Sequence, residues 1–540
     1  MHRETAHAHR PTAAGARDDW TTLTRAWPAL PATAVIVFVL LRLAFDQGGY
    51  FPAAYTAAGA IAFISLAVLV LRPSQERFST HALIALASLA AFACWTGLSR
   101  TWSVVPDVPV LDMQRAMLYV ALFGLGLLAA DSGRNARLLV WCVLGVVVVL
   151  VGAGLLSRLQ PDVVQSTIDP FVAPFYRLDH PFGYWNAFGA LASIGAVLAI
   201  GLAADTRGSV ILRGAAAGAA VMLVVAMYLS LSRGGWLALI LGLVVLVAIA
   251  PKRGSLLLAL VIAGGAAVVA ILRLGGYPAL VLDPKTGSGQ AAQGNAFTRE
   301  LVGLVLLAVV AQAALTRVRV SSLLEQQMRT VVRFALIGGG ILVVVVALAG
   351  YVAKGDQAEG RVTTAVDDAT GWLDRQWQDF LNPALSPGAG TARLVSAKGA
   401  RSDGYRVAID GFEASPLIGG GAGSFEVRYA RDRDIDVKIR DAHSLPLETL
   451  SELGVVGMLL LLGFLGAVAA AARRTIVGKG ALRPAEGAAV TGAFVVWLGH
   501  ASVDWDWEMP ALTGAAVVLS AALFQRGRRR RSHGRRATST

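Results

Sequence analysis

One histidine and its neighbours form the stretch of this chain best suited to chemistry. Arg440-Asp-Ala-His443-Ser-Leu-Pro-Leu-Glu448 is polar and runs directly into an apolar segment. Imidazole titrates near neutral pH, so His443 is a candidate general base. Glu448 lies in the first turn of the helix expected from Pro446, where its carboxylate suits the helix dipole and could orient the histidine. The alternative is a structural histidine that caps this helix.

Three arginines are candidates for contacts with a substrate. Ser232-Arg233-Gly234-Gly235 is a tight turn between two apolar segments. An arginine between membrane helices is unfavourable unless it snorkels or binds an anion, so both Ser232 and Arg233 are candidate site residues. Arg401 and Arg406 lie on a helix expected over residues 401–413, on which Arg401 shares a face with Tyr405.

A glycine run follows that helix. Gly419-Gly-Gly421-Ala-Gly423-Ser resembles a phosphate-cradling loop. No strand precedes it and no Lys-Ser/Thr pair ends it, so it is weak as a nucleotide motif. We take Gly421 and Gly423 as candidate substrate contacts.

Polar residues also lie where other apolar segments begin or end. Asn186 is in the first turn of one of them, where a buried amide needs a partner; it could be structural or could line a site. Asp504-Trp-Asp506-Trp-Glu508 combines three carboxylates with two tryptophans. Asp504 and Asp506 could bind a sugar, or pair with arginines and hold a loop against the helices, which we favour slightly. Asp432-Arg-Asp434-Ile-Asp436 could suggest a metal site, but its balanced charges favour a solvated turn, so we expect no metal and no cofactor.

Composition defines the fold class that must position these residues. The chain has 540 residues, of which 55% are hydrophobic and 15% are charged, and its mean hydropathy is +0.60. Soluble proteins carry about 25% charged residues. The apolar runs are continuous rather than alternating, so we predict an all-α, polytopic membrane bundle rather than a barrel.

The apolar runs predict fourteen transmembrane helices. The two weakest predictions are 299–316 and 487–502, so twelve or thirteen helices are also compatible with the sequence. The predicted spans are 29–46, 51–71, 80–98, 113–130, 137–157, 184–204, 210–231, 235–250, 255–274, 299–316, 331–352, 446–472, 487–502 and 510–525.

The distribution of basic residues predicts the orientation. With the amino terminus in the cytoplasm, the cytoplasmic segments hold 27 Lys and Arg residues and the short external segments hold eight. The net charge of +13 is therefore placed against anionic headgroups. The external loop has 12 basic and 14 acidic residues, which argues against a nucleic-acid partner. Cys94 and Cys142 both fall within predicted spans and are expected to be unpaired.

These patterns predict five regions. They are a cytoplasmic tail (1–27), a transmembrane bundle (28–352), a large extracytoplasmic loop (353–445), C-terminal transmembrane helices (446–525) and a basic cytoplasmic tail (526–540). Apolar residues at helical spacing over 361–381 predict an amphipathic helix in the loop.

The motifs together resemble the O-antigen ligase and polymerase family. The resemblance depends on Ser232-Arg233-Gly234, on Arg401 followed by the segment 416–425, and on Ala442-His443-Ser444 followed by the segment 452–457. It covers best the region from about 180 to 460. The chain departs from the family pattern at Ser444, where the family usually has asparagine.

The resemblance implies a membrane glycosyltransferase of cell-envelope polysaccharide biosynthesis. The donor would be a glycan on a polyprenyl diphosphate such as undecaprenyl diphosphate, and the acceptor a glycan or glycolipid hydroxyl. Arg233 and Arg401 match the family's essential arginines and would stabilise the departing diphosphate, while His443 would act as base. The same motifs occur in ligases and in polysaccharide polymerases. A transporter would explain Arg233 but not His443.

Overall fold

The apolar runs fold as helices in the computed structural model, which describes residues 28–71, 78–164, 177–281, 289–315 and 401–525 and a few positions between 325 and 382. Thirteen of the fourteen predicted spans are helical, and no strand occurs in the described residues. The span predicted at 331–352 lies almost wholly outside them. The helices are α2 (Ala29–Ala44), α3 (Pro52–Val70), α4 (Thr80–Leu98), α5 (Val108–Ala129), α6 (Gly133–Leu159), α7 (Trp185–Ala203), α8 (Val210–Leu229), α9 (Arg233–Ile249), α10 (Arg253–Leu274), α12 (Gln290–Leu315), α17 (Leu445–Ile476), α18 (Pro484–Ala501) and α19 (Pro510–Ala521).

The lengths of these helices confirm a polytopic helical membrane protein. Within the described residues, nine helices are long and apolar enough to cross a bilayer, and α2, α9 and α19 are shorter apolar helices. The two weakest predictions are also helices, α12 and α18. However, α12 begins at Gln290, nine residues before the predicted span.

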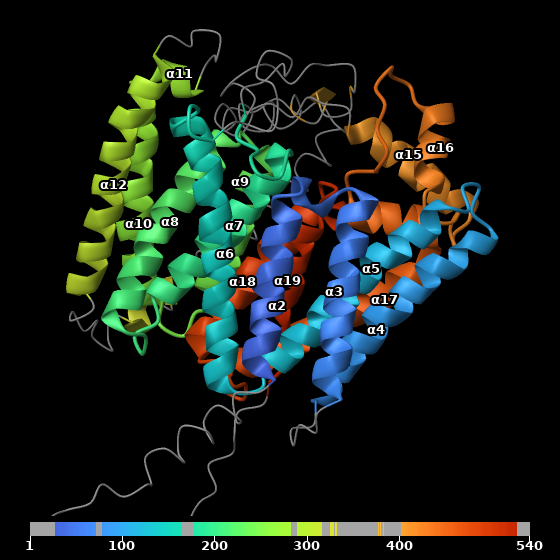
Figure 1. The fold of residues 1–540 in the computed structure, drawn as a ribbon, viewed down its shortest axis with the longest axis horizontal. Coiled ribbons are helices and arrows are strands. Elements are labelled where there is room, and N and C mark those ends of the chain that lie inside the picture. Colours follow the sequence, from blue (N-terminus) through green and yellow to red (C-terminus); the bar gives the residue numbers. More distant parts are fainter. Residues whose placement is uncertain are drawn as a thin grey trace, which may run out of the picture.

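Helix α7 lies at the centre of the bundle and packs against α8, α9 and α18 (Figure 1). All its residues from Asn186 to Ala203 are buried. Small residues let its neighbours approach closely: a Cβ added to Gly242 of α9 would lie 2.3 Å from a methyl of Val496 of α18. The site residues at the ends of these helices are therefore held by tight helix packing.

The turns rich in basic residues gather at one end of the bundle. The Ala481 amide donates to the Gln525 carbonyl at 3.0 Å, and the Ser79 hydroxyl donates to the Phe524 carbonyl at 3.3 Å. Arg483 forms an ion pair with Asp205 at 3.0 Å. These contacts bring together the turns that precede α4, α8 and α18 and the end of α19. The positive-inside pattern thus corresponds to one face of the fold.

The opposite end carries two further helices, α15 (Arg401–Ala414) and α16 (Ser424–Asp432) (Figure 1). The helix expected over 401–413 is confirmed as α15. The helix expected over 361–381 lies almost wholly outside the described residues. Helix α15 packs on α17, so the polar loop is joined directly to the membrane bundle.

The glycine run connects α15 to α16 and packs against a break in α17. Gly454 interrupts the regular helix with a φ of +63°. The Gly421 amide donates to the Glu452 carbonyl at 2.8 Å, and the Val455 amide donates to the Pro416 carbonyl at 2.9 Å. The backbone of the run therefore replaces helical hydrogen bonds that the break in α17 removes.

Candidate active site

His443 lies immediately before α17 with a backbone φ of +55°. A left-handed conformation is uncommon for residues other than glycine, and it persists only where neighbouring contacts fix it. The N-cap of α17 is Ser444, whose hydroxyl accepts from the Leu447 amide at 3.5 Å. The alternative in which His443 caps this helix is therefore wrong.

Three contacts hold the backbone around His443. The Glu448 carboxylate accepts from the Ala442 amide at 2.8 Å, and the Glu448 amide donates to the Ser444 carbonyl at 2.9 Å. The Tyr405 hydroxyl of α15 donates to the His443 carbonyl at 3.3 Å. Glu448 was expected to orient His443, and its hydrogen bond to the amide of Ala442, the residue before His443, is a contact through which it can do so.

The imidazole of His443 is oriented by its own loop. Its Nδ1 lies 2.9 Å from the Asp441 carbonyl oxygen. A carbonyl oxygen can only accept, so Nδ1 carries the hydrogen and Nε2 keeps its lone pair. No hydrogen bond to this Nε2 is formed by the described residues. This is the tautomer that a general base requires.

The surroundings of His443 favour its neutral form. Burial lowers the pKa of this imidazole below its ordinary value of 6.5, and the nearby Arg401 lowers it further, while Asp504 opposes both. The ring also makes an edge contact with Trp505, at a centroid distance of 6.3 Å. His443 is therefore able to accept a proton at neutral pH.

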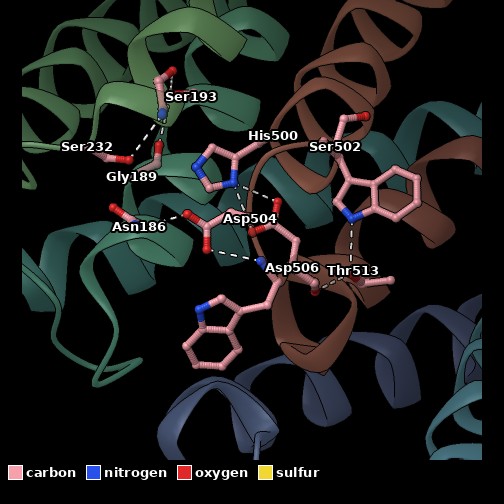
Figure 2. A network of polar contacts seen from close by, with 12 residues as sticks. Asn186, Gly189, Ser193, Ser232, His500, Ser502, Asp504, Asp506 and Thr513 are labelled. Atoms are coloured by element: carbon pink, nitrogen blue, oxygen red, sulfur yellow. Dashed lines mark hydrogen bonds and ion pairs between the residues drawn. The ribbon is translucent and has the colours of Figure 1, made fainter. Parts of the chain in front are cut away.

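Asp504 is the centre of a buried polar network between α18 and α19 (Figure 2). Its carboxylate forms an ion pair with Arg401. It also accepts from the Tyr184 hydroxyl at 2.6 Å and from the Asn186 amide at 2.8 Å. Burial alone would raise the pKa of Asp504, but Arg401, the two nearby histidines and the Tyr184 hydrogen bond together outweigh burial and hold this pKa below its ordinary value. The favoured pairing of this cluster with a loop arginine is therefore present.

Asn186 extends this network to the turn that precedes α9. Its side-chain oxygen accepts from Arg177 at 2.8 Å. The same guanidinium donates to the carbonyls of Ser230 at 2.8 Å and Leu231 at 3.1 Å, and it lies over the Trp185 ring. Asn186 is thus partnered, and through Arg177 it fixes the turn that leads to Arg233.

Arg233 is the first residue of α9, directly after the N-cap Ser232. The Ser232 hydroxyl accepts from the Gly235 amide at 3.0 Å, and Leu231 has a φ of +50°. The first turn of a helix carries a partial positive charge from its free amides. Arg233 adds its own charge at the same place, so this turn suits an anionic ligand.

Arg406 and the two glycines are engaged within the protein. Arg406 forms ion pairs with Asp403 at 2.6 Å and with Asp434 at 3.0 Å. Gly421 and Gly423 both have a positive φ, and the Gly421 amide is used in packing on α17. Substrate contacts by Arg406, Gly421 and Gly423 remain predictions.

Three carboxylates from distant segments also meet beside this region. Oxygen atoms of Asp441, Glu448 and Glu508 lie within 4.8 Å of one another, close enough to hold a cation. Spacing along the sequence could not reveal this group. The Arg115 guanidinium lies 3.5 Å from Glu508 and 2.7 Å from Asp112, and so supplies positive charge within the cluster.

Sequence reasoning missed several members of the site. Arg177, Tyr184 and His500 contribute to it, although none was among the candidate site residues. The predicted topology could have identified them, because each lies in a segment or at a helix end predicted to face the same side as His443.

The fold and the site define a polytopic helical membrane protein with ionisable residues converging at the helix ends of one face. Residues 218–462 match the family described as O-antigen ligase. The matched segment contains Arg233, Arg401 and His443, and the match confirms the resemblance to this family. The family has glycosyltransferase-type activity. No curated protein matches the chain significantly.

Proposed function

We propose that this protein transfers a glycan from a polyprenyl diphosphate carrier to an acceptor hydroxyl, as an O-antigen ligase-like enzyme. The observation that carries the proposal is the meeting of His443, Arg401 and the turn before Arg233 around Asp504. These residues come from four separate parts of the sequence. A base, a cation paired with Asp504, and a second arginine on a turn that Arg177 and Asn186 join to the same network match the needs of this reaction.

In the proposed reaction, Nε2 of His443 accepts the proton of the acceptor hydroxyl. The hydroxyl oxygen attacks the anomeric carbon of the donor glycan, and the bond from that carbon to the diphosphate breaks. The electron pair leaves with the diphosphate. Arg233 and Arg401 stabilise the negative charge that develops on it. Asp504 binds one edge of the Arg401 guanidinium and so orients the remaining N–H donors of that group.

Several features of the proposal follow from topology and chemistry. The site faces the extracytoplasmic side, both termini are cytoplasmic, and the loop 353–445 is extracytoplasmic. The partners are the lipid-linked donor, a glycan or glycolipid acceptor and the bilayer, with no nucleic acid. We also propose metal independence, because Arg115 already supplies positive charge to the carboxylate cluster.

Incubation of the purified protein in lipid nanodiscs with a labelled polyprenyl diphosphate glycan tests this function. A ligase is expected to form product only when a separate acceptor is added. A polymerase would instead lengthen carrier-linked glycan without it, and a transporter would form no new glycosidic bond. The expected ligase activity persists in EDTA. Loss of activity in EDTA, restored by a divalent cation, would contradict metal independence.

The proposed orientation predicts labelling from opposite sides. Asp436 of the loop has a side chain that is 96% exposed, and Lys252 lies exposed in a turn at the other end of the bundle. Cys94 and Cys142 are both unpaired and must first be replaced. In that background, Asp436→Cys should react with an impermeant maleimide added outside cells, and Lys252→Cys only after permeabilisation. Reaction of both from one side would refute the topology.

A further inference from the structure

His500 and Asp506 form a completely buried pair beside the candidate active site (Figure 2). His500 lies in the last turn of α18, and its Nδ1 lies 2.7 Å and 2.9 Å from the two carboxylate oxygens of Asp506. The backbone carbonyl of Asp506 accepts from the Thr513 hydroxyl at 2.6 Å, and that hydroxyl accepts from the Trp497 indole at 2.9 Å. The pair is therefore fixed from two helices.

The other ring nitrogen of His500 is turned toward the first turn of α9. A Cβ added to Gly234 would lie 3.0 Å from Nε2 and 3.2 Å from the adjacent ring carbon. Nε2 is buried and has no hydrogen-bond partner in the described part of the chain. Unpaired buried nitrogens are rare in folded proteins and usually have a functional reason.

The first turn of α9 is also held from its other sides. The Ser193 hydroxyl of α7 donates to the carbonyls of Gly189 at 2.8 Å and Gly235 at 3.2 Å. A Cβ on Gly189 would lie 2.6 Å from the Ser230 hydroxyl. Ser232 caps the same turn, so small buried groups hold it, and the ionisable His500 is packed directly against it.

The ring of His500 is held in one orientation against the first turn of α9. Because Asp506 accepts from Nδ1, the plane of the imidazole is fixed and its Nε2 edge lies against the backbone of Gly234. A bulkier group at the same position would push the turn, and Arg233 with it.

We propose that His500 and Asp506 are a positioning pair for Arg233, which sets the first turn of α9 where the carrier diphosphate binds. The inference rests on the proposed function, and it assigns the pair to recognition of a lipid diphosphate. Neither residue touches the reacting atoms. Gly234 belongs to the same arrangement, because only a residue without a side chain lets the His500 imidazole lie against the backbone.

The His500→Asn variant tests this role. The asparagine amide can still donate to Asp506 but provides no group at the Nε2 position. We expect KM for the lipid-linked donor to rise about tenfold or more, with KM for the acceptor changed less than about twofold. Binding of undecaprenyl diphosphate without a glycan should weaken by a similar factor. His500→Gln, which can place an amide near the Nε2 position, should recover part of the loss. His81→Asn, at the opposite end of the bundle, is the matched control.

Unchanged donor KM and unchanged diphosphate binding in folded His500→Asn would overturn the inference. If that variant fails to fold, Gly234→Ala provides a second test, since its methyl would crowd Nε2 and should also raise donor KM. Adding His500→Ala should relieve the crowding, so the two effects should not be additive; strict additivity would also overturn the inference. Absence of transfer by the unmodified protein would refute the proposed function, while diphosphate binding would still test the pair.

Discussion

The His443→Asn variant is expected to lose glycan transfer by a factor of roughly 10² to 10⁴, the usual contribution of a general base. The structure indicates that this substitution preserves the backbone conformation and the hydrogen bond to the Asp441 carbonyl. Asparagine tolerates a left-handed backbone better than most residues, and its amide can donate to the Asp441 carbonyl as Nδ1 of His443 does. It loses only the nitrogen that accepts the proton.

The same role predicts a defined pH dependence. A protonated imidazole cannot accept a proton, so kcat/KM should fall as pH drops through the pKa of His443. Burial and Arg401 lower this pKa, which places the acid limb below 6.5. Residual activity of His443→Asn should lack that limb. Activity per folded molecule, from size-exclusion profiles and donor binding, is the measurement that decides. Near-normal transfer by the variant would make His443 structural.

The helices could be predicted from the sequence because each span must bury about 20 apolar residues in lipid. The errors lie where polar residues are part of a helix. Helix α12 begins at Gln290, and its first turns contain Arg299 and Glu300, of which Glu300 pairs with Arg273 of α10. Helix α5 begins at Val108, five residues early, and its Asp112 and Arg115 pair with each other. A hydropathy average counts these charged residues as unfavourable in a helix, because it takes no account of the partners that neutralise them.

The site was only partly predictable for a related reason. His443, Arg233 and Arg401 are recognisable because each lies in a local motif. Their connection is not local: Arg401 and Asp504 are separated by 103 residues, and Glu452 accepts from the Phe425 amide at 3.0 Å across 27 residues. The packing of the glycine run on α17 could not be predicted from its sequence, because its hydrogen bonds to that helix are formed only in the fold.

Replacing either Arg233 or Arg401 with alanine is expected to lower turnover at least about tenfold. A lost charge-assisted contact to a diphosphate is worth roughly 1.5 to 3 kcal/mol, and tenfold corresponds to about 1.4 kcal/mol. Lysine should restore activity only in part, because it lacks the planar fork of a guanidinium. Arg431→Ala, on the exposed surface of α16, is the control. Full activity in both alanine variants at normal protein levels would refute the diphosphate contact.

Arg401 requires a second comparison, because its partner Asp504 is completely buried. Removing the arginine alone leaves an uncompensated buried charge and should destabilise the protein by about 3 to 5 kcal/mol. Asp504→Asn should remove most of that penalty, so the double variant is expected to be more stable than Arg401→Ala. Its turnover per folded molecule should still lie at least about tenfold below that of Asp504→Asn alone, since asparagine cannot replace a cation at the donor. Equal turnover in those two variants would mean that Arg401 serves only to hold α15 against the bundle, and the donor diphosphate would then depend on Arg233.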